Sequence, residues 1–181
     1  MAYVFAAGAV SALWALGILI HSILVPQKRL WPLPKLTPPI FMLIWVPTYL
    51  AFGSVIILSV MDWNHFGWPT VPRWGIGLPL IVIGHFTVWR GVKMLGLAAT
   101  SGAPDTLKTG GLYRYSRNPQ YTADIAMLTG WAILSASLWP LPLILALIAA
   151  LLLAPFAEEP WLREIYGAKY DEYCQKVRRF L

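Results

Sequence analysis

The sequence predicts an all-α integral membrane protein with about five transmembrane helices and an amphipathic helix at its carboxyl end. Hydrophobic residues make up 58% of the 181 residues and charged residues only 12%, and the mean hydropathy is +0.62. A chain of this composition is too apolar for an ordinary water-soluble domain. Each membrane crossing needs about 20 apolar residues, so the length accommodates one compact domain of a few crossings.

Apolar runs separated by turn-forming residues predict the individual spans. A proline-rich connection carrying Lys28, Arg29 and Lys35 joins the first two. The tryptophans before the third span suit an interfacial belt, and a short turn, Trp139 to Pro142, joins the last two as a helical hairpin. The predicted spans are residues 3–25, 40–61, 75–97, 119–138 and 140–156.

The distribution of positive charge predicts the orientation of these spans. If odd-numbered spans run inward, 13 of the 14 Lys and Arg residues lie on one side, and only Arg73 lies on the other. Because cytoplasmic loops carry the excess of Lys and Arg, we expect the amino terminus outside and the carboxyl terminus in the cytosol. The membrane would be a bacterial or archaeal inner membrane or the endoplasmic reticulum. The net charge of +6 is explained without nucleic acid, since no dense basic run is interleaved with aromatic residues.

A polar segment from Thr109 to Tyr121 interrupts the apolar runs. Its two adjacent glycines permit an irregular backbone, Arg114 and Arg117 supply cationic donors, and Asn118-Pro119 marks the start of the next helix. These features fit a ligand cradle. They fit equally a basic loop that anchors its neighbouring helices at the membrane surface.

The segment after the fifth predicted span changes to a charged, amphipathic pattern, which predicts a cytosolic helix over residues 158–179. Glu158 and Glu159 fall near the hydrocarbon boundary, where an acid needs water or a partner. They would be solvated by headgroups or would bind the hydroxyl or ammonium groups of a ligand. The single cysteine, Cys174, rules out an internal disulfide and a multi-cysteine metal site, and no metal is predicted.

Several short motifs recur in a fixed order around the last two predicted spans. They comprise Thr109-Gly110-Gly111-Leu112-Tyr113, Arg117-Asn118-Pro119-Gln120-Tyr121, Glu158-Glu159 with Leu162, and Tyr166-Gly167 with Tyr170, Tyr173 and Val177. In this order and spacing they resemble the isoprenylcysteine carboxyl methyltransferase and phospholipid methyltransferase family. The resemblance extends from Gly84 to Arg179. It implies a membrane enzyme that transfers a methyl group from S-adenosylmethionine to a lipophilic acceptor.

The same resemblance implies where the cofactor binds, namely between the loop 98–118, the start of the fourth span and the acidic pair. The implied cofactor-binding residues are Gly111, Leu112, Tyr113, Arg117, Asn118, Pro119, Tyr121, Glu158 and Glu159. Arg117, Glu158 and Asp124 are the catalytic candidates. Methyl transfer from a sulfonium is an in-line displacement that mainly requires alignment and exclusion of water.

Two positions depart from the family pattern. Asn118 stands where the family often has histidine, and it can form hydrogen bonds but cannot act as a base near neutral pH. Asp124 stands where a small residue is usual, and an acid within a span normally faces a polar cavity or a partner. It would either pair with Arg117 or Arg90, or steer or deprotonate an acceptor.

Two alternatives remain open at the level of sequence. Membrane sterol reductases, which use NADPH, resemble the same carboxyl-terminal pattern around Tyr166-Gly167, Tyr170 and Tyr173. A non-catalytic membrane module is the other alternative. The residues also do not distinguish among a prenylated cysteine, a phospholipid amine, a quinone-like ring and a hydrophobic thiol as acceptor.

Overall fold

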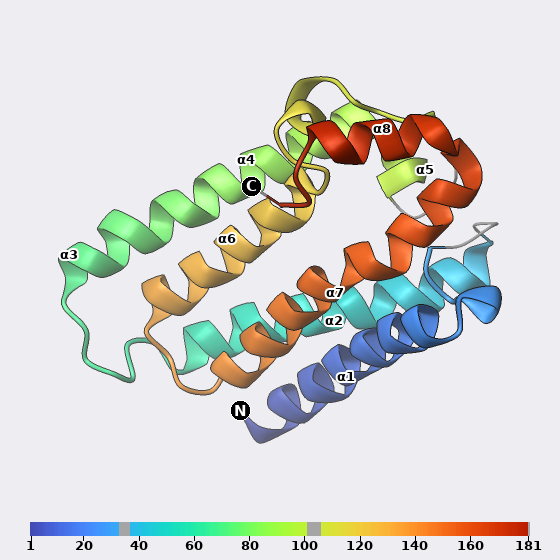
Figure 1. Ribbon diagram of the computed structural model, residues 1–181. Helices are drawn as coiled ribbons and strands as arrows, with labels where there is room; N and C mark the ends of the chain where they lie inside the picture. Colours follow the sequence, from blue (N-terminus) through green and yellow to red (C-terminus); the bar gives the residue numbers. More distant parts are fainter. Residues whose placement is uncertain (33–36, 101–105, 181) are drawn as a thin grey trace.

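The computed structural model describes residues 1–32, 37–100 and 106–180, and within these residues the chain is all-helical, as predicted (Figure 1). Lys35 and residues 101–105 of the expected loop lie outside the described part. The long helices are α1 (Ala2–Leu24), α2 (Pro38–Met61), α4 (Leu78–Leu95), α6 (Pro119–Ser135) and α7 (Leu141–Tyr166). The short ones are η1 (Pro26–Lys28), α3 (Thr70–Pro72), η2 (Arg73–Gly77), α5 (Leu97–Thr100), η3 (Gly111–Arg114) and α8 (Ala168–Lys176).

Four helical segments of the described chain are long and apolar enough to cross a membrane. They are Ala2–Leu24, Pro38–Met61, Thr70–Leu95, in which α3, η2 and α4 are continuous, and Leu141–Tyr166. The fourth predicted span corresponds to α6, which has only 17 residues. At 1.5 Å per residue it is about 26 Å long, slightly less than the roughly 30 Å of a hydrocarbon core. The count of five spans therefore stays a prediction.

The structure departs from the sequence prediction at the end of the fifth predicted span and in the helix predicted after it. Instead of ending near residue 156, α7 continues through Pro155 and Pro160 to Tyr166. Transmembrane helices tolerate proline when neighbouring groups satisfy the freed carbonyls. The helix ends at Gly167, whose φ of 54° is readily adopted only by glycine, and α8 follows. The predicted helix 158–179 is thus two helices joined at Gly167.

The fourth predicted span also ends earlier than expected, at Ser135 rather than residue 138. Ala136 adopts a left-handed conformation, with φ 47° and ψ 44°, and stops the helix. Asp62, at the end of α2, then accepts hydrogen bonds from the backbone N–H groups of Leu138 (2.8 Å) and Trp139 (3.2 Å). The α6–α7 turn is therefore fastened to the end of α2.

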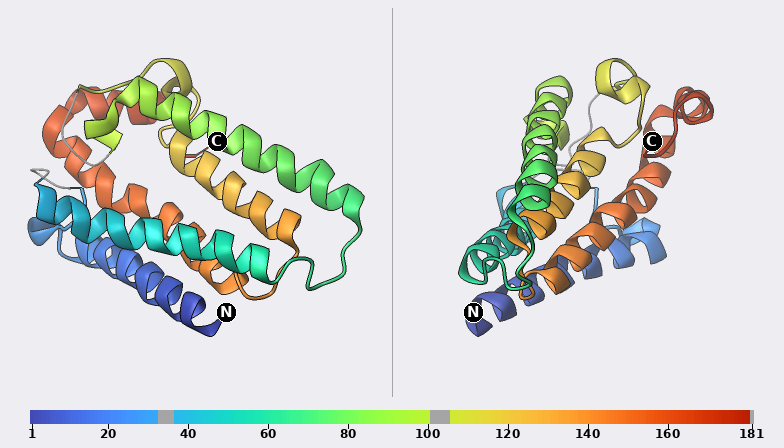
Figure 2. Two further views of the ribbon diagram at one scale, coloured as in Figure 1. Left: turned by 180° about the vertical axis from the view of Figure 1, so that it is seen from behind. Right: turned by 90° about the vertical axis from the view of Figure 1, so that its left-hand side faces the viewer.

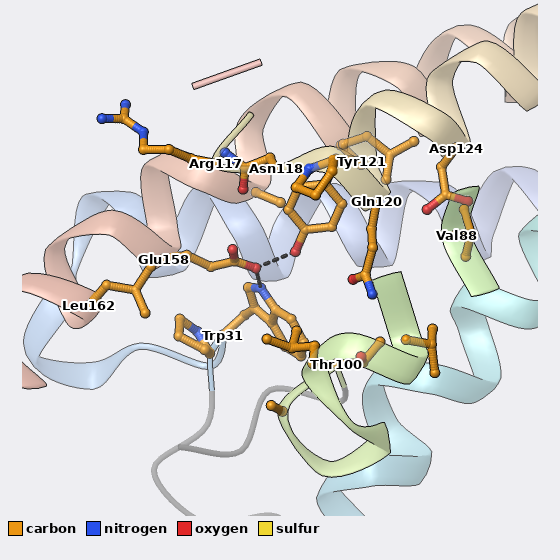
Figure 3. A pocket seen from close by; sticks show the side chains of 18 of the residues that line it. Trp31, Val88, Thr100, Arg117, Asn118, Gln120, Tyr121, Asp124, Glu158 and Leu162 are labelled. Atoms are coloured by element: carbon orange, nitrogen blue, oxygen red, sulfur yellow. Dashed lines mark hydrogen bonds between the residues drawn. The ribbon is translucent and has the colours of Figure 1, made fainter. Parts of the chain in front are cut away.

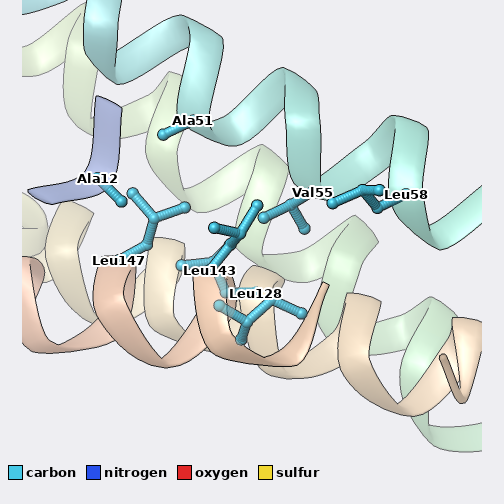
Figure 4. Packing of buried hydrophobic residues seen from close by; sticks show 8 residues of the cluster. Ala12, Ala51, Val55, Leu58, Leu128, Leu143 and Leu147 are labelled. Atoms are coloured by element: carbon cyan, nitrogen blue, oxygen red, sulfur yellow. The ribbon is translucent and has the colours of Figure 1, made fainter. Parts of the chain in front are cut away.

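Helices α1, α2 and α7 pack together, while α6 packs against α4 on one side and α7 on the other (Figure 2). The centre of the bundle is a cluster of small and branched side chains from α1, α2, α6 and α7 (Figure 4). Its buried members are Ala12, Ala51, Val55, Leu58, Leu128, Leu143, Ile144 and Leu147. Since lipid tails are as apolar as these side chains, close van der Waals packing stabilises the cluster.

Three glycines spaced seven residues apart allow α4 and α6 to approach closely. A Cβ on Gly77 would lie 2.7 Å from the Leu134 backbone nitrogen, and one on Gly84 would lie 2.7 Å from the Ala123 carbonyl oxygen. A Cβ on Gly91 would lie 2.6 Å from the Gln120 side chain. Small residues at such contacts are typical of packed membrane helices. This stripe fixes the position of α6 and the residues at its amino-terminal end.

Replacing Gly84 with alanine is expected to destabilise the protein, because the new methyl group meets backbone that cannot move aside. The expected cost is about 1–3 kcal/mol. The matched control is Gly17→Ala on α1, where a Cβ meets no atom of the described residues within 4 Å. There alanine should stabilise the helix by about 0.5–1 kcal/mol. Thermal unfolding of both variants in detergent measures the difference, and shifts of equal sign would contradict close α4–α6 packing.

Candidate functional site

A cavity of about 580 Å³ lies inside the bundle and reaches the end where α8 and the loop 106–118 lie. Its walls come from α1, α2, α4, α6 and α7, and Tyr170 and Tyr173 of α8 also line it. The volume is within the range of about 300–1,000 Å³ typical of small-molecule sites. Most of its lining is apolar, with a small number of polar side chains from α6 and α7 (Figure 3).

Glu158 is the central polar group of this cavity. One of its carboxylate oxygens accepts hydrogen bonds from the Tyr121 hydroxyl and, at 2.7 Å, from Trp31 Nε1 (Figure 3). Tyr121 comes from the first turn of α6, Glu158 from α7, and Trp31 from the connection between α1 and α2. Three distant segments therefore meet at one carboxylate.

Trp31 is a site residue that the sequence analysis missed. The connection that carries it is held by Ser22 of α1, whose hydroxyl accepts from the backbone N–H groups of Leu30 and Trp31, both at 3.0 Å. The same hydroxyl donates to the Ile18 carbonyl at 2.7 Å. Tryptophan in a proline-rich connection looks like an interfacial anchor. No local pattern distinguishes a tryptophan that turns inward, toward an acid 127 residues away.

Glu159 does not share the environment of its neighbour. It is 4% exposed and lies among arginines, accepting from Arg117 Nη2 at 2.9 Å and from Arg179 Nε and Nη2 at 2.8 and 2.9 Å. Arg163 Nη2 lies 3.9 Å from the same carboxylate. Sequence analysis predicted that Glu159 and Arg117 contact the cofactor. The structure pairs them with each other, although both also line the cavity, and Arg117 extends away from Glu158 and Tyr121 (Figure 3).

The carboxyl-terminal tail is hydrogen-bonded to the segment that precedes α6. The Asn118 side chain donates to the Arg179 carbonyl at 2.9 Å, and the Arg117 backbone N–H donates to the Arg178 carbonyl at 2.9 Å. Ser116 also donates to the Arg179 carbonyl, at 3.4 Å. Asn118, a predicted cofactor contact that lines the cavity, thus has its amide engaged with the tail. Pro119 follows it as the first residue of α6.

Gly111, Leu112 and Tyr113 belong to the short helix η3. Gly111 has a φ of 58°, and a side chain there would collide with Met94 of α4. The backbone carbonyl of Tyr113 accepts a hydrogen bond from the Tyr173 hydroxyl at 2.5 Å. Tyr113, Tyr170 and Tyr173 form a buried cluster that closes one end of the cavity. Burial and, next, the nearby carboxylate of Glu158 raise the pKa of Tyr113 well above its ordinary value.

Replacing Tyr173 with phenylalanine is expected to remove about 1 kcal/mol of stability by deleting its hydrogen bond. Burial raises the pKa of Tyr173 to about 12, although Arg117 lowers it. Because an unfolded tyrosine ionises near pH 10, the contribution of Tyr173 is complete below about pH 10 and is lost as the pH rises through its folded pKa.

Thermal unfolding between pH 8 and 12 tests this dependence. The Tyr173→Phe variant should lose stability less steeply with pH than the parent protein. Tyr115→Phe is the matched control, since Tyr115 is exposed and should leave the slope unchanged. An unchanged slope for Tyr173→Phe would contradict the pH-dependent contribution of Tyr173 to stability.

Asp124 lines the cavity one helical turn beyond Gln120. Among the described residues it forms no ion pair, since Arg117 pairs with Glu159 and Arg90 is exposed. Neither of the structural pairs expected with these arginines is seen among the described residues. Gln120, absent from the predicted site, also faces the cavity, and its buried Nε2 has no hydrogen-bond partner in the described structure. Its position in the Arg-Asn-Pro-Gln-Tyr motif was the signal that could have found it.

Together, the apolar helices and the cavity define a multi-span membrane protein with an internal, mostly apolar cavity of a size typical of small-molecule sites. Residues 72–169, more than half of the chain, match the family model described as phospholipid methyltransferase. The chain belongs to the phospholipid methyltransferase family, which confirms the resemblance inferred from its motifs. As a member of this family with several apolar helices, it is an integral membrane protein.

One similar protein is named for a different activity. The chain is similar to steroid 5-alpha-reductase DET2 of Solanum lycopersicum, with 28% identity over 110 residues. The match covers 60% of this chain and 42% of that protein, so the chain spans less than half the length of this relative. No solved structure matches the chain.

Proposed function

We propose that the protein is an S-adenosylmethionine-dependent methyltransferase acting on a lipophilic acceptor that enters from the bilayer. The family match is the observation that carries this proposal. The mostly apolar cavity supports it, because a few polar groups, among them Glu158, Tyr121 and Trp31, interrupt its apolar lining. Such a site has room for a polar cofactor beside an apolar acceptor.

The residues around Glu158 fit the chemistry of this cofactor. A buried carboxylate that already accepts two hydrogen bonds can also accept from an ammonium or from ribose hydroxyls. The faces of Tyr113 and Tyr121 can stabilise a sulfonium through cation–π contact. The buried N–H group of Trp45, which lacks a partner among the described residues, is a further available donor. When bound, the cofactor supplies an electrophilic methyl group on a positively charged sulfur.

In this proposal Arg117 and Glu159 are positioning residues. Their ion pair holds the start of α6 against α7, and α6 in turn carries Tyr121 to Glu158. Asp124 is the base candidate for an acceptor that must lose a proton, since it lies in the same cavity without a cationic partner in the described structure.

We also place this end of the bundle on the cytosolic side, with the amino terminus outside. The excess of Lys and Arg in the segments near α8 supports this orientation. An inner membrane of a bacterium or archaeon, or the endoplasmic reticulum, would then hold the protein.

The alternative is an NADPH-dependent reductase, which rests on the partial similarity to the tomato steroid reductase alone. Titrating the purified protein with S-adenosylhomocysteine and with NADPH, in parallel, separates the two. Binding of S-adenosylhomocysteine but not NADPH is the expected result. Binding of NADPH alone would overturn the methyltransferase proposal, and binding of neither would favour a non-catalytic module.

A further inference from the structure

Two further polar side chains face the cavity from α6, away from the Glu158 carboxylate. Gln120 and Asp124 are four residues apart, so they lie on the same face of the helix, with about 5–6 Å between their Cβ atoms. Figure 3 shows the Gln120 amide directed toward Thr100 and the Asp124 carboxylate beside Val88 of α4. Gly91 provides the space for Gln120, since a Cβ there would lie 2.6 Å from its side chain.

Within the described structure, neither the Gln120 side-chain N–H nor the Asp124 carboxylate has a partner. Gln120 Nε2 and Thr100 Oγ1 are buried without a hydrogen bond, and Asp124 forms no ion pair. Burying such groups unpaired costs free energy, so an unpaired buried group in a native protein calls for an explanation, and a ligand that pairs with it is one. A donor and an anionic acceptor, side by side on a cavity wall, are arranged for a ligand that satisfies both.

We infer that Gln120 and Asp124 form the recognition site for the acceptor, and that the acceptor is a lipophilic phenol. This inference rests on the proposed methyltransferase function. A hydroxyl can accept a hydrogen bond from Gln120 and donate one to Asp124. A carboxylate can only accept and is repelled by Asp124. An alkylamine is mostly an ammonium at neutral pH, which can only donate and leaves the Gln120 N–H unpaired, and only its minor neutral form could pair with both residues.

The walls of the cavity favour an aromatic ring over an alkyl alcohol. On α2, Trp45 lies between Phe41 and Tyr49, with ring centroids 6.1 and 5.6 Å apart, and Trp31 meets Trp45 edge-on at 6.2 Å. Trp31, Trp45 and Tyr49 all line the cavity, as does Trp89 on α4. Aromatic side chains prefer offset or edge-on contact with another ring. A phenol also ionises near pH 10, far more readily than an alkanol, so Asp124 can assist its deprotonation.

The reaction balances with these residues. The phenol oxygen forms a bond to the methyl carbon as the bond between that carbon and the sulfonium sulfur breaks, and the bonding electron pair stays on sulfur. The phenol proton passes to the Asp124 carboxylate and then to solvent. The products are an aryl methyl ether, the neutral thioether and one proton. Gln120 holds the oxygen in place throughout, which makes it a specificity-determining residue.

Four acceptors with one common tail test the inference: 4-dodecylphenol, dodecanoate, dodecylamine and dodecanethiol. The purified full-length protein in lipid nanodiscs is incubated with each acceptor and S-adenosylmethionine labelled in its methyl group. We expect the phenol to receive label at least about tenfold faster than the other three acceptors. Each of these would leave a buried protein group unpaired, and that penalty lowers the rate of methyl transfer by this factor or more.

Binding is measured separately from activity, through quenching of tryptophan fluorescence by 4-dodecylphenol without cofactor. Asp124→Asn and Gln120→Leu should each weaken phenol binding about tenfold and leave the affinity for S-adenosylhomocysteine within about twofold. Asp171→Asn and Gln175→Leu, on the exposed face of α8, make the same chemical changes as controls. Both controls should behave as the parent protein.

Different results would contradict the proposed methyltransferase function and the inference about its acceptor. If S-adenosylhomocysteine does not bind, the methyltransferase function falls, and the acceptor inference falls with it. If S-adenosylhomocysteine binds but label goes to the carboxylate, amine or thiol in preference to the phenol, or to none of the four, only the acceptor inference is overturned. Unchanged phenol binding in both Asp124→Asn and Gln120→Leu would overturn it as well.

Discussion

Replacing Glu159 with alanine is expected to destabilise the protein by about 3–5 kcal/mol, because it leaves Arg117 and Arg179 facing each other without a counter-ion. The Glu159 side chain is 6% exposed and that of Arg117 is 11% exposed, so water can replace the lost carboxylate only in part. The Arg179 side chain is 32% exposed, which favours the lower end of this range. Thermal and denaturant unfolding in detergent measure the loss.

The control for this experiment is Glu164→Ala, five residues further along α7. Glu164 also pairs with an arginine, Arg29 at 2.8 Å, but its side chain is 56% exposed. Exposed pairs contribute about 0–1 kcal/mol, so this variant should be nearly as stable as the parent. A loss of comparable size in both variants would show that the buried network has no special role.

Replacing Glu158 with glutamine is expected to weaken S-adenosylhomocysteine binding about 10- to 100-fold. Glutamine keeps the shape of the side chain and can still accept from Tyr121 and Trp31. It cannot carry the negative charge that the proposed function assigns to binding an ammonium or ribose hydroxyls. Hydrogen bonds to charged groups contribute about 1.5–3 kcal/mol, which gives the expected range. Isothermal titration calorimetry measures the affinity.

Glu172→Gln, on the exposed face of α8, makes the same charge change and should not alter this affinity. The unfolding temperature of Glu158→Gln should remain close to that of the parent, since its hydrogen-bond partners are retained. Unchanged affinity in Glu158→Gln would remove Glu158 from the cofactor site. Lost affinity together with a large loss of stability would mean that the residue acts through folding.

The sequence predicted the all-helical fold class, because long apolar runs are a local signal. The predicted ends of α6 and α7 were wrong, because tertiary contacts determine where these helices end. Pro155 and Pro160 normally mark helix ends, yet α7 continues through both and stops at Gly167. Local propensity is a weak guide where neighbouring helices can satisfy the freed backbone groups.

The site was predicted as a set of residues but not as an arrangement. Glu158 and Glu159 are adjacent in sequence and both line the cavity, but the helix turns them about 100° apart, so that one accepts from Tyr121 and the other from arginines. The partners that complete each environment, Trp31 and Arg179, come from segments whose role no local pattern reveals. Gln120 was visible in the motif, but only its unpaired amide in the folded cavity points to a function.

The tail contacts of Arg178 and Arg179, and the bond from Trp31, have a practical consequence for dissecting this protein. The region matched by the family model, residues 72–169, contains Glu158 and Glu159 but neither Trp31 nor Arg179. A fragment trimmed to that region would keep every predicted site residue and lose a hydrogen-bond partner of each glutamate. The region matched by the family model and the part of the chain that forms the candidate site therefore have different boundaries.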